Sequence, residues 1–158
     1  MSPERKEKLP LSQAVTHLLE ECRMVLPGLQ ALFGFQLIAV FNTGFGDKLT
    51  PTEQQVHLLA LGLVAIAGAL VMAPAAYHRQ TSPHEVTESF LTLASRLLLG
   101  SMIPLMLGIG LDFYLIARVI LNNSLLSLLL TLVLISIFSS AWFLLPRISA
   151  LQRLVRGR

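Results

Sequence analysis

The sequence predicts an all-α membrane protein, a polytopic four-helix bundle with an amphipathic helix at its N-terminus. Of its 158 residues, 54% are apolar and 13% are charged, and the mean hydropathy is +0.68. Soluble domains carry about 25% charged residues, and a chain of this size cannot hide so much apolar surface in one small core. Four apolar stretches are each long enough for the roughly 20 helical residues of a bilayer crossing. We therefore expect one membrane domain over residues 1–158.

The four expected spans cover residues 24–45, 56–77, 97–117 and 125–145. Their sequences do not alternate between apolar and polar residues as the strands of a membrane β-barrel would, so we expect helices. A capping box with proline at the first helical position, formed by Thr50, Pro51 and Glu53, predicts the start of the second helix. Ser82 and Pro83 repeat this pattern before the third helix.

Residues 9–23, which precede the first span, form the amphipathic segment. Its apolar residues recur at helical spacing, at Leu11, Val15, Leu18, Cys22 and Val25. Two arrangements fit this pattern: a helix that lies along the inner membrane surface, or an extension of the first span that packs on the bundle. In both, the basic ends of the chain would favour anionic lipid headgroups as partners.

The distribution of Lys and Arg predicts the orientation. The N-terminal segment, the connection between the second and third spans and the C-terminal tail hold ten of the twelve, and the other two connections hold Lys48 and Arg118. The positive-inside rule then places both termini in the cytoplasm. We expect a multi-pass protein of the inner (cytoplasmic) membrane. Since this rule already explains the basic residues, we expect no nucleic-acid partner.

Small residues at steps of three and four predict where the helices touch, because close backbone contact favours helix association in lipid. The second span carries such a stripe at Gly62, Ala65, Ala69, Ala73 and Ala76, and the third span carries one at Gly100, Pro104 and Gly108. We expect these stripes to pack within one chain. Pro74 and Pro104 each free a backbone carbonyl and can kink their helices.

Ionisable residues inside membrane spans are rare, costly and often functional. Asp112, toward the far end of the third span, is a candidate ion or proton site; the alternative is a boundary residue at the membrane interface. Arg118 is its nearest candidate partner in sequence. Arg96, at the near end of the same span, is long enough to reach the headgroups. We expect His57 at the outer surface as a solvated residue.

The stretch EECRMVLPGLQALFGFQ (residues 20–36) predicts a second candidate site. One helical face carries Glu20, Arg23, Pro27, Gln30, Gly34, Leu37 and Phe41. Because lipid would reject Gln30, we expect this face to point into the bundle. Together with the cytoplasmic end of the second span, it predicts a polar cluster of Glu20, Glu21, Arg23, Gln30, Tyr77, His78 and Arg79. The cluster fits either a network that fixes helix register or a site for a ligand, ion or partner.

Two sequence segments, LLEECRMVLPGLQALFGFQ and VMAPAAYHR, resemble an uncharacterised family of small bacterial membrane proteins with four predicted helices. Members share an acid–x–arginine stretch before VLPGxQxLF and an APxxYHR end to the second span. The matching positions are Glu21, Arg23, Pro27, Gly28, Gln30, Pro74, Tyr77, His78 and Arg79. Motif alignment favours Glu21 as the acid, whereas helical geometry favours Glu20. Some members carry a sodium:proton antiporter label.

Two classes of function remain, because the sequence has no HExxH, CxxC, Walker or GxSxG motif. We therefore expect no enzyme activity, no metal and no cofactor. The first class is a non-catalytic scaffold, accessory or oligomeric subunit, which predicts that the polar cluster pairs internally and leaves no cavity. The second is a small homo-oligomeric transporter or channel for protons or monovalent cations, which predicts a polar pathway from the cluster to Asp112.

Overall fold

The computed structural model describes residues 10–81 and 87–148, and these residues are almost entirely helical. The elements are α1 (Leu11–Val40), α2 (Phe45–Lys48), α3 (Pro51–Thr81), α4 (Glu88–Leu121), α5 (Ser124–Ser139) and the π-helix η1 (Ser140–Leu144). α1, α3, α4 and the helix that begins with α5 are long and apolar enough to cross a membrane. The described residues contain no strand, and the predicted all-α four-helix class is confirmed.

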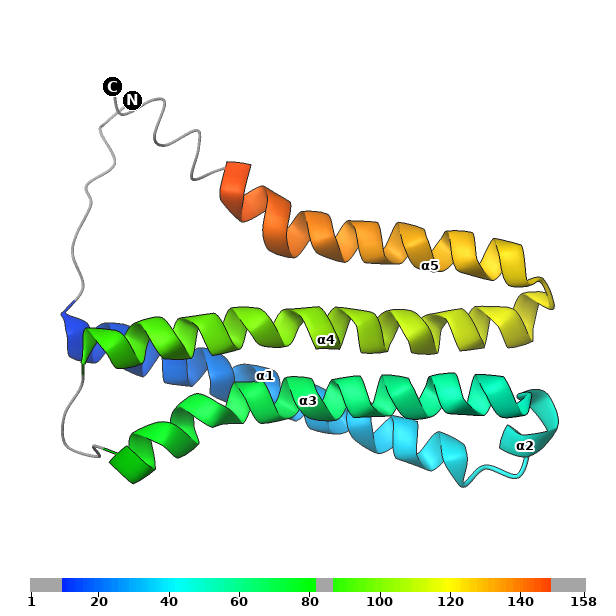
Figure 1. The fold of residues 1–158 in the computed structure, drawn as a ribbon, viewed down its shortest axis with the longest axis horizontal. Helices are drawn as coiled ribbons and strands as arrows, with labels where there is room; N and C mark the ends of the chain where they lie inside the picture. The colour runs from blue at the N-terminus through cyan, green and yellow to red at the C-terminus, as the bar shows by residue number, and fades with distance from the viewer. Residues whose placement is uncertain (1–9, 82–86, 149–158) are drawn as a thin grey trace.

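Successive long helices run in opposite directions along the long axis of the molecule (Figure 1). α1, α3 and α4 pack against one another, while α5 lies along α4 on the side away from α1 and α3. α2 closes the connection between α1 and α3, so we call this end of the bundle the α2 end. At the opposite end, α1 and α4 begin and α3 finishes.

The capping box at the start of α3 is confirmed. The backbone N–H of Thr50 donates to Oε2 of Glu53 at 2.8 Å, and the N–H of Glu53 donates to Oγ1 of Thr50 at 3.4 Å. Pro51 is the first residue of α3, where its missing N–H costs nothing. These contacts fix the point at which the chain turns from α2 into α3.

The other helix starts use Thr87 and Asn123. The hydroxyl of Thr87 accepts the backbone N–H three residues further on, at 3.2 Å, and α4 begins at the next residue. The predicted cap at Ser82 and Pro83 lies outside the described residues. Asn122 ends α4 in the left-handed conformation (φ 50°), and the side chain of Asn123 caps α5. Asparagine suits both positions, because it tolerates positive φ and accepts local backbone hydrogen bonds.

α1 is one continuous helix that includes the amphipathic segment from Leu11 onward. Val15, Leu18 and Cys22 are buried, each less than a tenth exposed. The segment is therefore an extension of the first span that packs on the bundle, the second of the two predicted arrangements. α1 ends at Val40, earlier than the expected limit at residue 45, because the chain turns there into α2.

The apolar core lies between α1, α3 and α4, from the middle of the bundle toward the end away from α2. Its buried members are Val15, Leu18, Cys22, Leu29, Val64, Ala67, Val71, Phe90 and Ala94. Partly buried leucines and Phe33 surround this cluster. Figure 1 shows α3 bending toward its C-terminal end, and α3 contains Pro74, which removes a helical hydrogen bond.

Gly108 brings α4 close to α3. A Cβ at this position would lie 2.9 Å from Cγ2 of Val64 and 3.1 Å from the carbonyl oxygen of Ala60, so only glycine fits without a shift. Gly100 belongs to the same predicted stripe, yet a Cβ there would meet no atom within 4 Å. Pro104 is half-buried between these two positions. The close contact is therefore confined to one turn of α4.

The seam on α3 differs from the predicted stripe. Ala65 and Ala69 are exposed, Gly62 and Ala73 are half-buried, and a Cβ on Gly62 would meet no neighbouring atom. The buried positions of α3 are instead His57, Ala60, Val64, Ala67, Val71 and Pro74. The reason is that α3 is apolar on nearly all sides, so small residues alone do not mark the face that packs. Two valines fill part of this buried face, and two alanines allow close approach.

Two hydroxyl groups of α5 are buried against neighbouring residues and are satisfied by hydrogen bonds to the backbone of the same segment. Ser127 and Thr131 are buried, and each donates to the backbone carbonyl four residues earlier, at 2.7 and 2.8 Å. On α4, a Cβ at Gly110 would lie 3.0 Å from Cδ1 of Ile135, which shows how close the two helices are. These hydroxyls satisfy their own helix, as expected, and need no other ligand.

Candidate functional site

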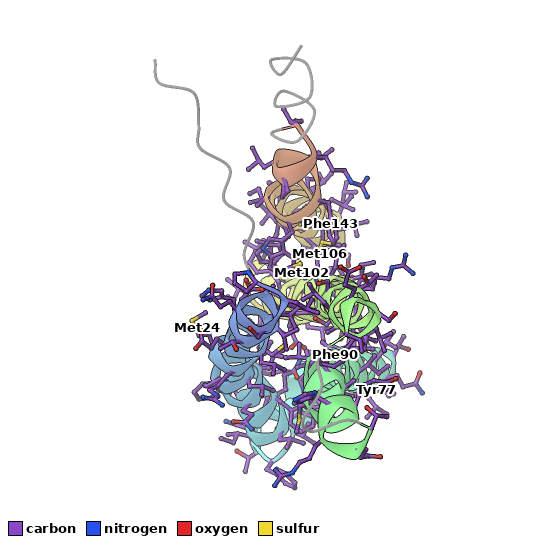
Figure 2. All side chains as sticks on the ribbon, turned by 90° about the vertical axis from the view of Figure 1, so that its left-hand side faces the viewer. Met24, Tyr77, Phe90, Met102, Met106 and Phe143 are labelled. Atoms are coloured by element: carbon purple, nitrogen blue, oxygen red, sulfur yellow. The ribbon has the colours of Figure 1, made fainter. Side chains whose placement is uncertain are left out.

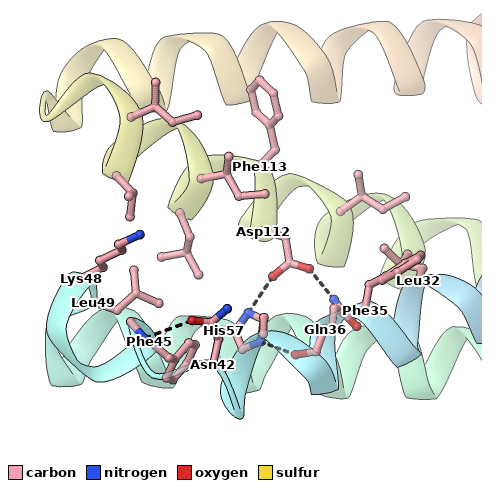
Figure 3. Close-up of a pocket in the computed structure, with 17 residues that line it drawn as sticks. Leu32, Phe35, Gln36, Asn42, Phe45, Lys48, Leu49, His57, Asp112 and Phe113 are labelled. Atoms are coloured by element: carbon pink, nitrogen blue, oxygen red, sulfur yellow. Dashed lines mark hydrogen bonds and ion pairs between the residues drawn. The ribbon is translucent and has the colours of Figure 1, made fainter.

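Three polar side chains from three helices meet near the α2 end: Gln36 of α1, His57 of α3 and Asp112 of α4 (Figure 3). Nδ1 of His57 lies 3.0 Å from Oδ1 of Asp112, and its Nε2 lies 3.0 Å from the backbone carbonyl oxygen of Gln36. Nε2 of Gln36 donates to the other carboxylate oxygen of Asp112. The three helices are thus joined by polar contacts at a level where each is otherwise apolar.

The length of α4 gives the depth at which the site would lie in a bilayer. α4 has 34 residues, which corresponds to about 51 Å of helix against a hydrocarbon thickness of about 30 Å. A centred helix therefore extends about 10 Å beyond the hydrocarbon at each end. Asp112 lies nine residues before the end of α4, or about 14 Å along the axis. In a helix centred in this way, the carboxylate would lie just inside the apolar layer, where an unpaired charge is costly.

The partners of His57 indicate its protonation state. Both ring nitrogens face oxygen atoms that only accept hydrogen bonds, the Asp112 carboxylate and the Gln36 carbonyl. A neutral imidazole has one N–H, whereas the imidazolium has two. The observed arrangement is therefore satisfied when the His57–Asp112 pair holds one proton beyond the neutral imidazole and the carboxylate, either as imidazolium and carboxylate or as neutral imidazole and carboxylic acid. The two side chains are 9% and 15% exposed.

Gln36 is buried and has one unsatisfied atom. Its amide nitrogen faces the Asp112 carboxylate, so its Oε1 points elsewhere, and this oxygen has no hydrogen-bond partner among the described residues. A buried acceptor without a donor is unfavourable. On the other side of the site, the ring of Phe45 in α2 lies 5.4 Å from the ring of His57, edge to face. α2 thereby covers the imidazole from the end of the bundle.

A cavity of about 570 Å³ lies beside these residues, between the second halves of α1 and α4 and beneath α2 (Figure 3). Its walls are mainly apolar, and the polar side chains that line it are Gln36, Asn42, Lys48, His57 and Asp112. Phe35, Ile116 and Ile120 belong to its lining and are more than half exposed, so the cavity reaches the protein surface. In a bilayer, these exposed apolar side chains would face lipid.

Arg118 is not the partner of Asp112. Its Nε lies 3.7 Å from Oε1 of Glu53, and its Nη1 donates to Oδ1 of Asn122 at 3.1 Å. Asp112 and Arg118 are six residues apart on α4, which places them on different faces of the helix. The contact with Glu53 joins α3 to α4 one turn closer to the α2 end than His57.

A model for a family of unknown function (DUF6328) matches residues 5–146. The chain belongs to this family. The prediction of an uncharacterised family is confirmed at that level. No curated protein and no solved structure matches the chain. The DUF6328 match runs from α1 through η1, so it includes all three helices that supply Gln36, His57 and Asp112.

The predicted polar cluster is not assembled in the DUF6328 chain. Glu20, Glu21, Arg23 and Gln30 are all exposed on α1. Glu20 lies 3.6 Å from His17 of its own helix, and both side chains are more than half exposed. Figure 2 shows the neighbouring Met24 pointing away from the bundle. The face that carries Gln30 is thus the outer face of α1, because the apolar residues of α1 supply a second, inward face.

The other half of the predicted cluster, at the end of α3, makes aromatic contacts. The rings of Tyr77 and His78 lie 6.0 and 5.3 Å from the ring of Phe90 (Figure 2). Arg79 is exposed and makes no ion pair with the described residues. This end of α3 is therefore held to α4 by stacking around Phe90, without the acids of α1.

Sequence analysis missed Gln36 as a site residue and placed His57 in solvent, yet a signal for both exists. Steps of seven residues along α1 lead through the buried residues Val15, Cys22, Leu29 and Gln36. The same steps along α3 lead through His57, Val64 and Val71, which are also buried. A seven-residue repeat marks one face of a packed helix. Polar residues that continue such an apolar repeat are expected to point inward.

Proposed function

We propose that this integral membrane protein is a non-catalytic transporter or channel for protons or monovalent cations, and that His57, Asp112 and Gln36 form its proton site. The observation that carries the proposal is the position of His57 between two acceptors, a carboxylate and a backbone carbonyl, each 3.0 Å away. Such a site binds a proton as an imidazolium and returns it when the pair separates. Histidine is the side chain whose charge changes most readily near neutral pH.

The surroundings of the pair favour exchange over a permanent ion pair. The cavity reaches both His57 and Asp112, which gives water or an ion access to the carboxylate. Other charged groups near this end are Lys48 of α2 and the Glu53–Arg118 pair between α3 and α4. Lys48 and Arg118 are positively charged and Glu53 is negatively charged. Their net positive charge disfavours a second cation at the site, unless the Asp112 carboxylate has lost its contact with His57 and can neutralise that cation.

The described residues of one protomer supply no polar pathway to the opposite end. Between the site and that end lie Val64, Ala67 and Val71 of α3, packed against α1 and α4. The predicted pathway from the polar cluster to Asp112 is therefore replaced by an apolar core. Transport would require movement of α1 against α3 and α4, or a pathway between copies in a homo-oligomer. We place the α2 end outside and both termini in the cytoplasm, on the distribution of Lys and Arg.

A proteoliposome assay tests this proposal. Protein is reconstituted in bacterial-type lipid with an anionic fraction, and proton, sodium and potassium fluxes are followed with enclosed dyes under an imposed gradient. Wild type is compared with Asp112→Asn and His57→Gln, and with Glu20→Gln as a control acid on the outer face of α1. We expect flux from wild type and Glu20→Gln, and loss of at least tenfold in both site variants. Absence of any cation flux from folded wild type would contradict the proposal.

A second candidate is a scaffold, accessory or oligomeric subunit, and the exposed Gln30 favours it. Gln30 lies ten residues before the end of α1, about 15 Å along the helix and thus within the apolar layer. An amide facing lipid at this depth is unfavourable, so a second helix would be expected to cover it. Gln30→Leu should then reduce crosslinking between copies or partners in membranes, while Gln13→Leu at the start of α1 should not. Equal crosslinking in both variants would remove Gln30 from the argument.

A further inference from the structure

We infer that the cavity beside His57 and Asp112 binds an amphipathic organic ammonium ion, and that this ligand and the proton of His57 compete for the Asp112 carboxylate. The proton half of this exchange rests on the proposed function; the ligand half rests on the cavity itself. The ligand class is a primary or secondary amine that carries an apolar body of up to drug size.

The size and lining of the cavity fit such a ligand. A volume of about 570 Å³ lies in the range of sites that hold one drug-sized molecule. Isoleucine, leucine and phenylalanine side chains form most of the wall, and they would hold an apolar body. Because Phe35, Ile116 and Ile120 are exposed at the surface of the same cavity, a ligand that dissolves in the bilayer can enter directly from lipid.

The polar groups of the cavity call for a donor of hydrogen bonds. The Asp112 carboxylate accepts one bond on each oxygen in the structure, and each oxygen can accept a second. The Oε1 of Gln36 has no partner. An ammonium group with two or three N–H donors would neutralise Asp112, and a small rotation of the Gln36 amide would let Oε1 accept one of its N–H groups. Lys48 also lines the cavity, but its side chain is exposed on α2, where the repulsion is reduced by solvent.

The exchange keeps the charge of the site constant. When Asp112 is ionised, its negative charge is matched by a proton on His57, 3.0 Å away. When an ammonium ion takes the carboxylate, His57 gives one of its two ring protons to water and becomes neutral, so one cation replaces another. The Nε2–H bond to the Gln36 carbonyl or the Nδ1–H bond to Asp112 is lost in that step. Binding of the amine should therefore release up to one proton for each molecule bound.

Three matched probes test the ligand class: decylammonium, decyltrimethylammonium and decanol. Full-length protein is placed in nanodiscs of phosphatidylcholine, whose headgroup has no N–H donor, and binding is measured by calorimetry against empty nanodiscs. We expect decylammonium to bind about tenfold or more tightly than decanol, because a charged hydrogen bond is replaced by a neutral one. Decyltrimethylammonium, which keeps the charge and lacks N–H donors, should fall between them. Equal affinity for all three would overturn the inference.

Variants locate the site. Asp112→Asn should weaken decylammonium about tenfold or more and leave decanol unchanged, and Glu20→Gln should change neither. Gln36→Met should weaken decylammonium by a smaller factor and leave the charge of the site intact. Because the comparison of the three probes uses wild type alone, the inference stays testable even if a site variant fails to fold. Binding of decylammonium that is the same in Asp112→Asn would overturn it.

An aminophospholipid carries the same chemistry, and a further arm distinguishes it. Phosphatidylethanolamine replaces part of the phosphatidylcholine in the nanodisc, and decylammonium binding is measured again. Unchanged affinity supports a free amine. Loss of decylammonium binding would mean that the lipid headgroup occupies the site, which overturns the assignment to a free amine.

Proton release on binding separates the two proposals. It is followed in weakly buffered solution with a pH-indicator dye, in parallel with proton flux in proteoliposomes. Binding of decylammonium that depends on Asp112, without proton release and without flux, would contradict the proposed proton site and leave the amine site standing. Flux that depends on Asp112, without preference for decylammonium over decanol, would contradict the amine site and leave the proposed function standing.

Discussion

The same three helices meet in two different ways along their length. In the half away from α2, the seam is apolar and closed, with valine, leucine and cysteine at successive positions of α1 and α3. In the half near α2, the next position of each repeat is polar, Gln36 on α1 and His57 on α3, and a cavity of about 570 Å³ lies beside them. The half away from α2 is closely packed, whereas the half near α2 contains a cavity and ionisable side chains.

This difference teaches that one residue per helix can change the character of a seam. Polar residues on two of the helices bring a carboxylate on the third into contact, and the group as a whole joins α1, α3 and α4. Because buried polar groups must be satisfied by one another, the polar half depends on complete sets of partners. The apolar half depends on shape instead. Four predictions test this contrast.

The largest effect is expected in the polar half. Asp112→Leu leaves the buried His57 and Gln36 side chains without the carboxylate that both contact, and we expect a loss of about 3 kcal/mol in the free energy of unfolding. The double variant His57→Leu, Asp112→Leu should recover most of this loss, because neither charge is then buried alone. Unfolding in SDS of the detergent-solubilised protein measures both. Additive losses in the double variant would show that the two residues do not act as a pair.

The apolar half should respond to the size of a side chain. Gly108→Ala places a methyl group against Val64 and the Ala60 carbonyl, and we expect a loss of about 2 kcal/mol from overpacking. Gly100→Ala, on the same helix, adds the same methyl group in open space. Its higher helix propensity should make it neutral or stabilising. The same SDS titration compares the two, and equal losses would contradict a local contact at Gly108.

A smaller effect is expected at the junction between α2 and α3. Thr50→Ala removes the hydroxyl that accepts the N–H of Glu53, and we expect a loss of about 1 kcal/mol. Thr52→Ala, in the first turn of α3 and exposed, is the matched control. Hydrogen exchange at the start of α3 should rise in Thr50→Ala alone. An unchanged exchange rate would mean that α2 holds this turn without the cap.

The smallest effect is expected for the contact between Glu53 and Arg118. The two groups lie 3.7 Å apart and the arginine is 30% exposed, so Arg118→Gln should cost about 0.5 kcal/mol, and less at high salt. Arg96→Gln removes an exposed arginine of α4 that has no ion pair among the described residues. It should have no effect on unfolding. A larger loss of unfolding free energy for Arg118→Gln than for Asp112→Leu would contradict the assignment of the stronger contact to Asp112.

Local patterns predicted the helical class well. The lengths of the apolar stretches fixed the number of long helices, and the capping box placed the start of α3 at Pro51. These features depend on residues that are close in sequence. Asp112 was also identified as a candidate site, because a carboxylate inside an apolar run is unfavourable without a partner.

The packing faces were harder to predict, because lipid accepts apolar residues on the outside of a helix. α1 has one face with Gln30 and another with Leu29 and Gln36, and the rule that polar residues point inward favours both. The seven-residue repeat through Val15, Cys22 and Leu29 favours Gln36, and the contacts between helices show that it is the buried one. The partner of Asp112 is 55 residues away in sequence, on another helix. The contact between His57 and Asp112 lies about one turn from the close approach of Gly108 to Ala60.

The position of α5 has a consequence for the order of synthesis. α5 lies along α4 and away from the seam that holds Gln36, His57 and Asp112. The chain leaves the ribosome from its N-terminus, so all three residues have been made before α5 emerges. The site can therefore assemble from the first three long helices while the last is still being translated. Insertion of α5 then adds a helix beside α4 without changing the residues of the site.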